Sequence, residues 1–146
     1  MTPRLNIQNI QPEAYKAMYA LEKYMAGTQL TNTHKELIKI RTSQINGCAF
    51  CLDMHTKDAL KYGETPQRIF ILPAWRETTL FTPEERAILA LAEEVALISN
   101  GGVSDATYKN AVEVLGETYV AQAIMATVTI NAWNRIAIST QLQPAQ

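Results

Sequence analysis

The segment that most constrains the fold of this chain runs from Glu117 to Ser139, more than twenty residues without a proline or a glycine. Its β-branched residues would suit a strand, but ordinary strands are only about 5–6 residues long. We therefore predict one long helix. Apolar residues lie almost all round it, which predicts burial on several sides and, in so small a chain, a contact between subunits. These residues are Val120, Ile124, Val128, Ile130, Trp133, Ile136 and Ile138.

Shorter helices are predicted from the period of the apolar residues and from the residues that begin and end helices. The chain is divided into helices by prolines at first helical positions, by threonine or serine caps, and by glycines at helix ends. Residues 73–81 are predicted to be a loop. There is no linker or internal repeat, so we predict an all-α fold with a single domain over residues 1–146, of which residues 1–11 form an N-terminal arm. The predicted helices lie near residues 12–26, 31–46, 48–62, 65–72, 82–99, 104–115 and 117–139.

The composition argues against several classes of partner. The net charge of the 146-residue chain is −1, so there is no basic excess for binding nucleic acid. No apolar run approaches the ~18 residues that a spanning helix needs, and the first residues do not resemble a signal peptide. We expect a soluble, cytoplasmic protein that binds neither nucleic acid nor membrane.

Both cysteines of the chain, Cys48 and Cys51, follow the turn signal Asn46-Gly47. If Cys48 begins a helix, then Cys51 and His55 lie on one face of that helix. In a reducing cytosol, such a pair is more often catalytic or metal-binding than a structural disulfide. A disulfide between them would close too small a loop to constrain the unfolded chain much, so its value would lie in being made and broken.

A thiol attacks as its thiolate, so one of the two cysteines needs a base nearby. His55 lies one helical turn after Cys51. If the two helices that meet at Gly47 form an antiparallel hairpin, Glu36 lies roughly 16 Å from the corner and His55 roughly 12 Å from it, at ~1.5 Å per residue. This predicts a relay of Glu36, His55 and Cys51. The nucleophile stays open, because Cys48 lies closer to the helix N-terminus, which favours a thiolate.

Two other interpretations of these residues compete with the relay. Thr33 and Glu36 fit a capping box, in which the glutamate would accept a bond from the Thr33 amide. Alternatively, Cys48, Cys51 and His55 could bind zinc, with His34 or Glu36 as the fourth ligand. A structural zinc site normally shows four Cys or His ligands, which disfavours zinc here, and we predict no cofactor.

The spacing Glu36, eleven residues, Cys48-x-x-Cys51, three residues, His55 resembles the core motif of alkyl hydroperoxidase D (AhpD), in the carboxymuconolactone decarboxylase superfamily. The resemblance continues through residues 63–65, 74–77 and 130–135 and covers essentially the whole chain. It implies an all-helical fold that forms homo-oligomers, often trimers or hexamers. It also implies an antioxidant thiol peroxidase that reduces organic hydroperoxides and hydrogen peroxide.

The resemblance further implies roles for individual residues. Cys51 would be the peroxidatic cysteine, Cys48 the resolving cysteine, and Glu36 and His55 parts of the proton relay. An external dithiol, which in this family can be a lipoylated protein, would reduce the resulting disulfide. The AhpD pattern has a second histidine immediately before the peroxidatic cysteine, where this chain has Phe50. The relay would then run through His55 or a water.

Two alternative functions and the role of residues 133–135 also need to be considered. A lactone decarboxylase from the other branch of the superfamily is the first alternative function, but its chemistry does not need a cysteine pair. A non-enzymatic redox sensor or a zinc-stabilised interaction protein is the second. We interpret Trp133, Asn134 and Arg135 as packing and subunit contacts rather than as parts of the chemistry.

Overall fold

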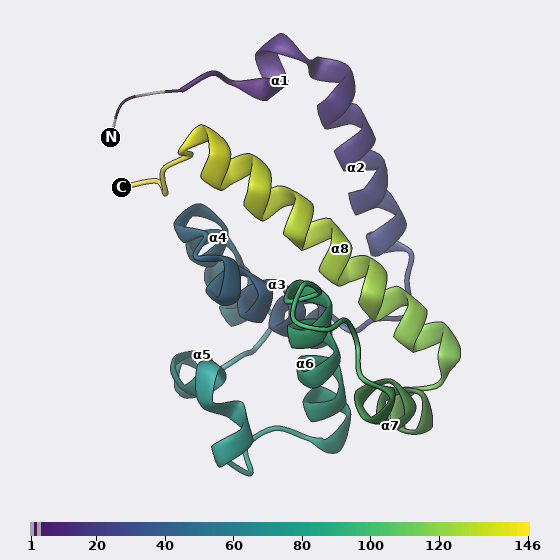
Figure 1. Ribbon diagram of the computed structural model, residues 1–146. Helices are drawn as coiled ribbons and strands as arrows, with labels where there is room; N and C mark the ends of the chain where they lie inside the picture. The colour runs from purple at the N-terminus through teal and green to yellow at the C-terminus, as the bar shows by residue number, and fades with distance from the viewer. Residues whose placement is uncertain (1, 3) are drawn as a thin grey trace.

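The computed structural model describes residues 2 and 4–146, and the regular secondary structure of this part is entirely helical (Figure 1). This confirms the predicted all-α fold. Residues 1 and 3 of the predicted N-terminal arm lie outside the described residues, and the rest of that segment contains the short helix α1. The elements are α1 (Ile7–Ile10), α2 (Pro12–Ala26), α3 (Asn32–Asn46), α4 (Ala49–Lys61), α5 (Pro66–Ile71), the 3₁₀ helix η1 (Leu72–Glu77), α6 (Pro83–Ala96), α7 (Asp105–Leu115) and α8 (Glu117–Thr140).

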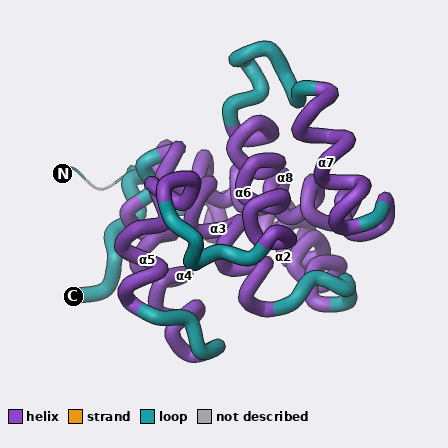
Figure 2. Tube along the Cα trace, turned by 90° about the horizontal axis from the view of Figure 1, so that it is seen from below, coloured by secondary structure: helices purple, strands orange, loops and turns teal. Residues whose placement is uncertain are grey.

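Most helices begin and end at the residues that the sequence indicates. The hydroxyl groups of Thr31, Thr65, Thr82 and Ser104 each accept a bond from the backbone N–H three residues later, which satisfies a donor that the first turn leaves free. Gly47 ends α3 with a φ of 71°, a left-handed conformation that glycine adopts without a Cβ clash. Only two residues therefore join α3 to α4, and the two helices form the predicted hairpin (Figure 2).

The predicted loop over residues 73–81 is wrong for its first part, where η1 extends to Glu77. Pro73 lies in the first turn of η1, where its missing N–H removes no hydrogen bond. Trp75 is buried and packs in one core cluster with Leu72 and Phe81. This packing holds residues 72–77 in a compact turn although the proline interrupts the preceding helix. Helix α6 also ends at Ala96, before the glycines that we expected to end it.

Helix α3 lies at the centre of the molecule and contacts α4, α6 and α8 (Figure 1). The main core cluster contains both cysteines together with apolar residues of α3, α6, α7 and α8. Helix α8 is buried along its alanine and threonine side, but Val128 and Ile138 are each 43% exposed. The chain alone therefore leaves part of α8 uncovered, and the homo-oligomer remains a prediction. Within residues 2 and 4–146, no helix combines the length and hydropathy needed to cross a bilayer.

Candidate functional site

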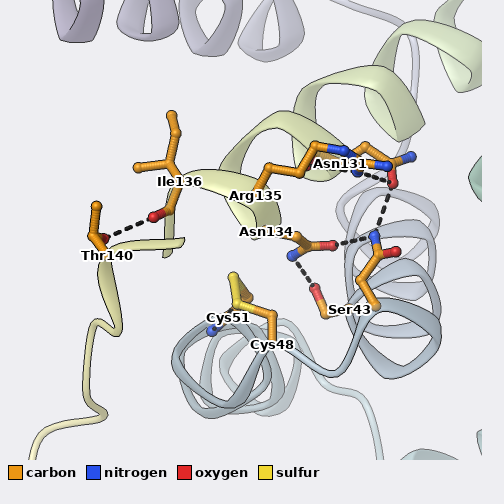
Figure 3. Close-up of a disulfide and its surroundings, with 9 residues drawn as sticks. Ser43, Cys48, Cys51, Asn131, Asn134, Arg135, Ile136 and Thr140 are labelled. Atoms are coloured by element: carbon orange, nitrogen blue, oxygen red, sulfur yellow. Dashed lines mark hydrogen bonds between the residues drawn. A yellow bond between two sulfur atoms is a disulfide. The ribbon is translucent and has the colours of Figure 1, made fainter. Parts of the chain in front are cut away.

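Cys48 and Cys51 form a disulfide at the start of α4 (Figure 3). Cys48 is the N-cap residue of this helix, and its Sγ accepts a hydrogen bond of 3.3 Å from the backbone N–H of Cys51. The exposed fractions of Cys48 and Cys51 are 1% and 3%. The structure thus holds the pair in its oxidised form, with the positive end of the α4 dipole directed at the sulfur of Cys48.

A buried polar network fixes the corner that precedes the cysteines. The Asn134 side chain is fully buried; its amide donates to Ser43 Oγ at 2.9 Å, and its oxygen accepts from Asn46 Nδ2 at 2.9 Å. Asn46 Nδ2 also donates to Asn131 Oδ1, and the Ser43 carbonyl accepts from the Cys48 N–H. Figure 3 shows the hydrogen bond between Asn134 and Ser43 and the disulfide near it. Asn134 therefore ties α8 to the end of α3 within one chain, which agrees with the predicted packing role, and its predicted subunit contact stays a prediction.

The carboxylate of Glu36 contacts the ring of His55. Glu36 Oε2 lies 3.2 Å from His55 Nδ1, and Glu36 Oε1 lies 3.3 Å from Lys39 Nζ. The capping-box interpretation of Glu36 is wrong, because Thr31 rather than Thr33 caps α3 and bonds the His34 N–H. The helical rise of the hairpin brings Glu36 and His55 to the same level, as predicted.

Burial of Glu36 by itself would raise the pKa of its carboxyl group. The hydrogen bond from His55 and the charge of Lys39 outweigh burial, and together they hold this pKa below its ordinary value. Glu36 is therefore a carboxylate at neutral pH and accepts the Nδ1–H of His55. With Nδ1 engaged by Glu36, Nε2 is the ring nitrogen left to exchange a proton with a neighbouring group.

A cavity of about 540 Å³ opens beside this pair. Cys51, His55, Lys39 and Asp58 line it, whereas Cys48 does not. Further wall residues come from α1, α2 and the second half of α8, so the cavity lies among these helices and α4. Figure 1 shows α8 running between α2 and α4. Phe50, at the position of the second histidine of the AhpD pattern, also lines the cavity. Of the two sulfurs, that of Cys51 is therefore the one that a molecule in the cavity would meet.

Sequence reasoning missed three charged residues that line the cavity, Lys39, Asp58 and Glu22. Lys39 lies one helical turn after Glu36, and Asp58 lies one turn after His55, so helical spacing could have indicated both. The α2 residues that line the cavity could not be found from helical spacing, because their position depends on how α2 crosses α8.

The possible metal ligands in this region differ from the zinc set that we considered. Sulfurs joined in a disulfide offer no thiolate to a metal. His34 lies elsewhere, with its Nδ1 2.5 Å from the hydroxyl oxygen of Tyr119. Across the described part of the chain, the group of three that could hold a cation is Glu36, His55 and Asp58, whose ligand atoms lie within 4.8 Å of one another.

Comparison with known proteins identifies the family. The model of the carboxymuconolactone decarboxylase family matches residues 12–94, a range that includes all four predicted site residues. The chain is also 45% identical over 139 residues to the uncharacterized protein YdfG of Bacillus subtilis, and this match covers 95% of each chain.

Solved structures share the fold. A protein of unknown function from Agrobacterium tumefaciens, with a suggested antioxidant-defence role as AhpD, is 36% identical and superposes with a TM-score of 0.95 over 99% of each chain. At 23% identity, an uncharacterized peroxidase-related protein with an AhpD core from Ralstonia eutropha has a TM-score of 0.81, over 95% of this chain and 74% of that one. The debrominase Bmp8, 16% identical, has a TM-score of 0.84 over 94% of this chain and 74% of its own. The chain therefore belongs to the carboxymuconolactone decarboxylase family and has an AhpD-like fold.

Proposed function

We propose that the protein is a thiol peroxidase of the AhpD type, which reduces organic hydroperoxides with the Cys48–Cys51 pair. One observation carries this proposal: His55, which is hydrogen-bonded to Glu36, lines the same cavity as Cys51, and Cys51 is bonded to a second cysteine outside the cavity wall. A base with an orienting carboxylate beside a cysteine is the arrangement that activates a thiol nucleophile.

In the first step, the Cys51 thiolate attacks one oxygen of the hydroperoxide and the O–O bond breaks. Cys51 becomes a sulfenic acid, and the second oxygen leaves with the organic group. His55 Nε2 takes the proton of the Cys51 thiol and delivers it to that leaving oxygen, which departs as an alcohol. Glu36 fixes the ring through Nδ1 and stabilises the imidazolium that forms between the two transfers.

In the second step, the Cys48 sulfur attacks the sulfenic sulfur of Cys51. The disulfide forms and water leaves with the proton of the Cys48 thiol. The balance is one hydroperoxide and two thiols converted to one alcohol, one water and one disulfide. The disulfide present in the structure is the product expected of this step.

An external dithiol, such as a lipoylated protein, then reduces the disulfide by exchange. Attack on Cys51, which lines the cavity, releases Cys48 as a thiolate. The N–H of Cys51 and the N-terminus of α4 already favour negative charge on that sulfur. The base beside Cys51 and the helix dipole at Cys48 thus serve opposite halves of the cycle.

Thiol counting tests this proposal. The reduced protein, freed of reductant, is treated with one equivalent of cumene hydroperoxide, and we expect two thiols per chain to be lost and then recovered with dihydrolipoamide. Cys48→Ser should lose one thiol and give a sulfenic acid that dimedone traps, whereas Cys51→Ser should keep its thiol. The proposal is wrong if the wild-type thiols persist or if Cys51→Ser reacts as fast as Cys48→Ser.

A further inference from the structure

The cavity has an aromatic wall away from the cysteines. Trp133 of α8 packs edge-on against Tyr15 of α2, with ring centroids 5.5 Å apart, and Tyr19 lies 6.0 Å from the same indole. The indole N–H of Trp133 donates to Glu22 Oε1 at 2.9 Å. All four side chains line the cavity, so Trp133 is held in one orientation by a hydrogen bond and by two neighbouring rings.

The space between this wall and Cys51 is bordered largely by apolar side chains. Phe50 and Met54 of α4 and Ile136 of α8 line it together with Trp133. Its volume of about 540 Å³ falls in the range of ~300–1,000 Å³ that is usual for sites of small organic molecules. A hydrogen peroxide molecule, not much larger than a water of ~30 Å³, would leave most of it unfilled.

The charges around the cavity disfavour an anion. Glu22 and Asp58 both line it. Of the residues that line it, Lys39 is a cation, but its ammonium group already pairs with Glu36 at 3.3 Å. A carboxylate on a bound molecule would therefore meet like charges in a site with a reduced dielectric constant, where their repulsion is stronger than in water.

We propose that the cavity selects hydroperoxides with a neutral, apolar organic group of about the size of a phenyl ring, and that Trp133 and Glu22 determine this specificity. This inference rests on the proposed peroxidase function. The indole of Trp133 provides the surface on which the apolar group packs. Glu22 orients the indole, and its charge repels anionic compounds.

A binding experiment tests the proposal without any chemistry. The oxidised protein is titrated with 2-phenylpropan-2-ol, the alcohol formed from cumene hydroperoxide, and separately with the same alcohol carrying a para-carboxylate. The indole N–H signals of the two tryptophans, Trp75 and Trp133, are followed by NMR. We expect the neutral alcohol to shift the Trp133 signal and to bind at least about 10-fold more tightly than the carboxylate. Equal affinities for the two alcohols would overturn the proposal.

Variants separate the two roles. Trp133→Ala should weaken binding of the neutral alcohol about 10-fold. Glu22→Gln removes the negative charge but keeps an acceptor for the indole N–H, so it should strengthen binding of the carboxylate and reduce the difference in affinity between the two alcohols. Tyr24→Ala, on the exposed side of α2, is the control and should change the affinity for neither alcohol. If Trp133→Ala does not fold, Tyr15→Leu removes part of the same aromatic wall and should weaken binding of the neutral alcohol about threefold.

Steady-state kinetics then connects binding to turnover. Trp133→Ala should lower kcat/KM for cumene hydroperoxide about 10-fold, mainly through KM, and should leave kcat/KM for hydrogen peroxide unchanged. An equal loss for both substrates would show that Trp133 is only structural and would overturn the proposal. If the wild-type protein turns over neither hydroperoxide, the peroxidase function fails, while the titration still decides how the cavity selects its ligand.

Discussion

The carboxylate of Glu36 and the ring of His55 are joined by a hydrogen bond of 3.2 Å, although nineteen residues separate them along the chain. The bond connects α3 to α4 across the hairpin that turns at Gly47. Because hydrogen bonding and the charge of Lys39 keep the pKa of buried Glu36 below its ordinary value, its carboxylate accepts the Nδ1–H and orients the imidazole. This relationship makes the proposed role of His55 as a proton carrier testable through its partner.

Glu36→Gln should slow oxidation of the thiols. Glutamine retains an acceptor for the Nδ1–H of His55 but carries no charge to stabilise the imidazolium. We expect oxidation by cumene hydroperoxide at pH 7 to be about 10²-fold slower, measured by thiol loss after rapid mixing, with the helical circular dichroism unchanged. Glu13→Gln, in an exposed pair with Lys16, is the control. A wild-type rate in Glu36→Gln would remove Glu36 from the relay.

Lys39→Gln should change the pH dependence of the same reaction. The charge of Lys39 helps to hold the pKa of Glu36 below its ordinary value of 4.5, so its loss should raise that pKa. The relay needs Glu36 as a carboxylate, so the acid side of the rate profile should move to higher pH. Lys57→Gln, whose partner Asp53 lies outside the cavity lining, should leave the profile in place. If the acid side of the rate profile does not shift in Lys39→Gln, Lys39 does not control the protonation of Glu36.

Asn134→Leu should destabilise the fold by leaving polar groups in the core unpaired. Ser43 Oγ would lose the Asn134 donor, and Asn46 would lose one of its two acceptors. We expect a loss of about 2 kcal/mol in the free energy of unfolding, measured by urea unfolding of the oxidised protein. Arg135→Ala, on the exposed side of α8, should change it by less than about 0.5 kcal/mol. A similar effect of the two substitutions would show that the network contributes little.

The helices were predictable where the determinants are local. Thr82 and Glu85 form their capping box within four residues, and the apolar run from Glu117 onward excludes a strand by its length alone. Helix η1 was missed because its determinants are distant. Trp75 belongs to the same core cluster as Phe81 and donates its indole N–H to Glu93. No local pattern of residues 72–77 indicates these partners.

The part of the site that depends on one hairpin was predictable, and the part that depends on packing between distant helices was not. Helical rise was enough to bring Glu36 beside His55, because both lie on helices joined at a known corner. The place of Trp133 was not predictable from its own helix, where it fits a core position. It lines the cavity because α2 crosses α8 at that level, and its contact with Tyr15 joins residues far apart in the sequence.

Glu93→Gln should weaken the fold in a manner that depends on pH. Burial would raise the pKa of Glu93, but hydrogen bonds from Arg41, Trp75 and Arg76 outweigh it and lower that pKa below 4.5. The carboxylate therefore contributes stability that is complete above pH 4.5 and is lost as the pH falls through the lowered pKa.

We expect Glu93→Gln to reduce the free energy of unfolding by about 2 kcal/mol at pH 7, because Arg41 and Arg76 lose their shared counter-charge. The difference from wild type should shrink as the pH falls below 4.5, where protonation of Glu93 removes the same charge from the wild-type protein. Urea unfolding at pH 7 and at decreasing acid pH measures both values, with Glu77→Gln on the exposed side of η1 as the control. A difference that stays constant with pH would mean that Glu93 acts through its shape and hydrogen bonds rather than through its charge.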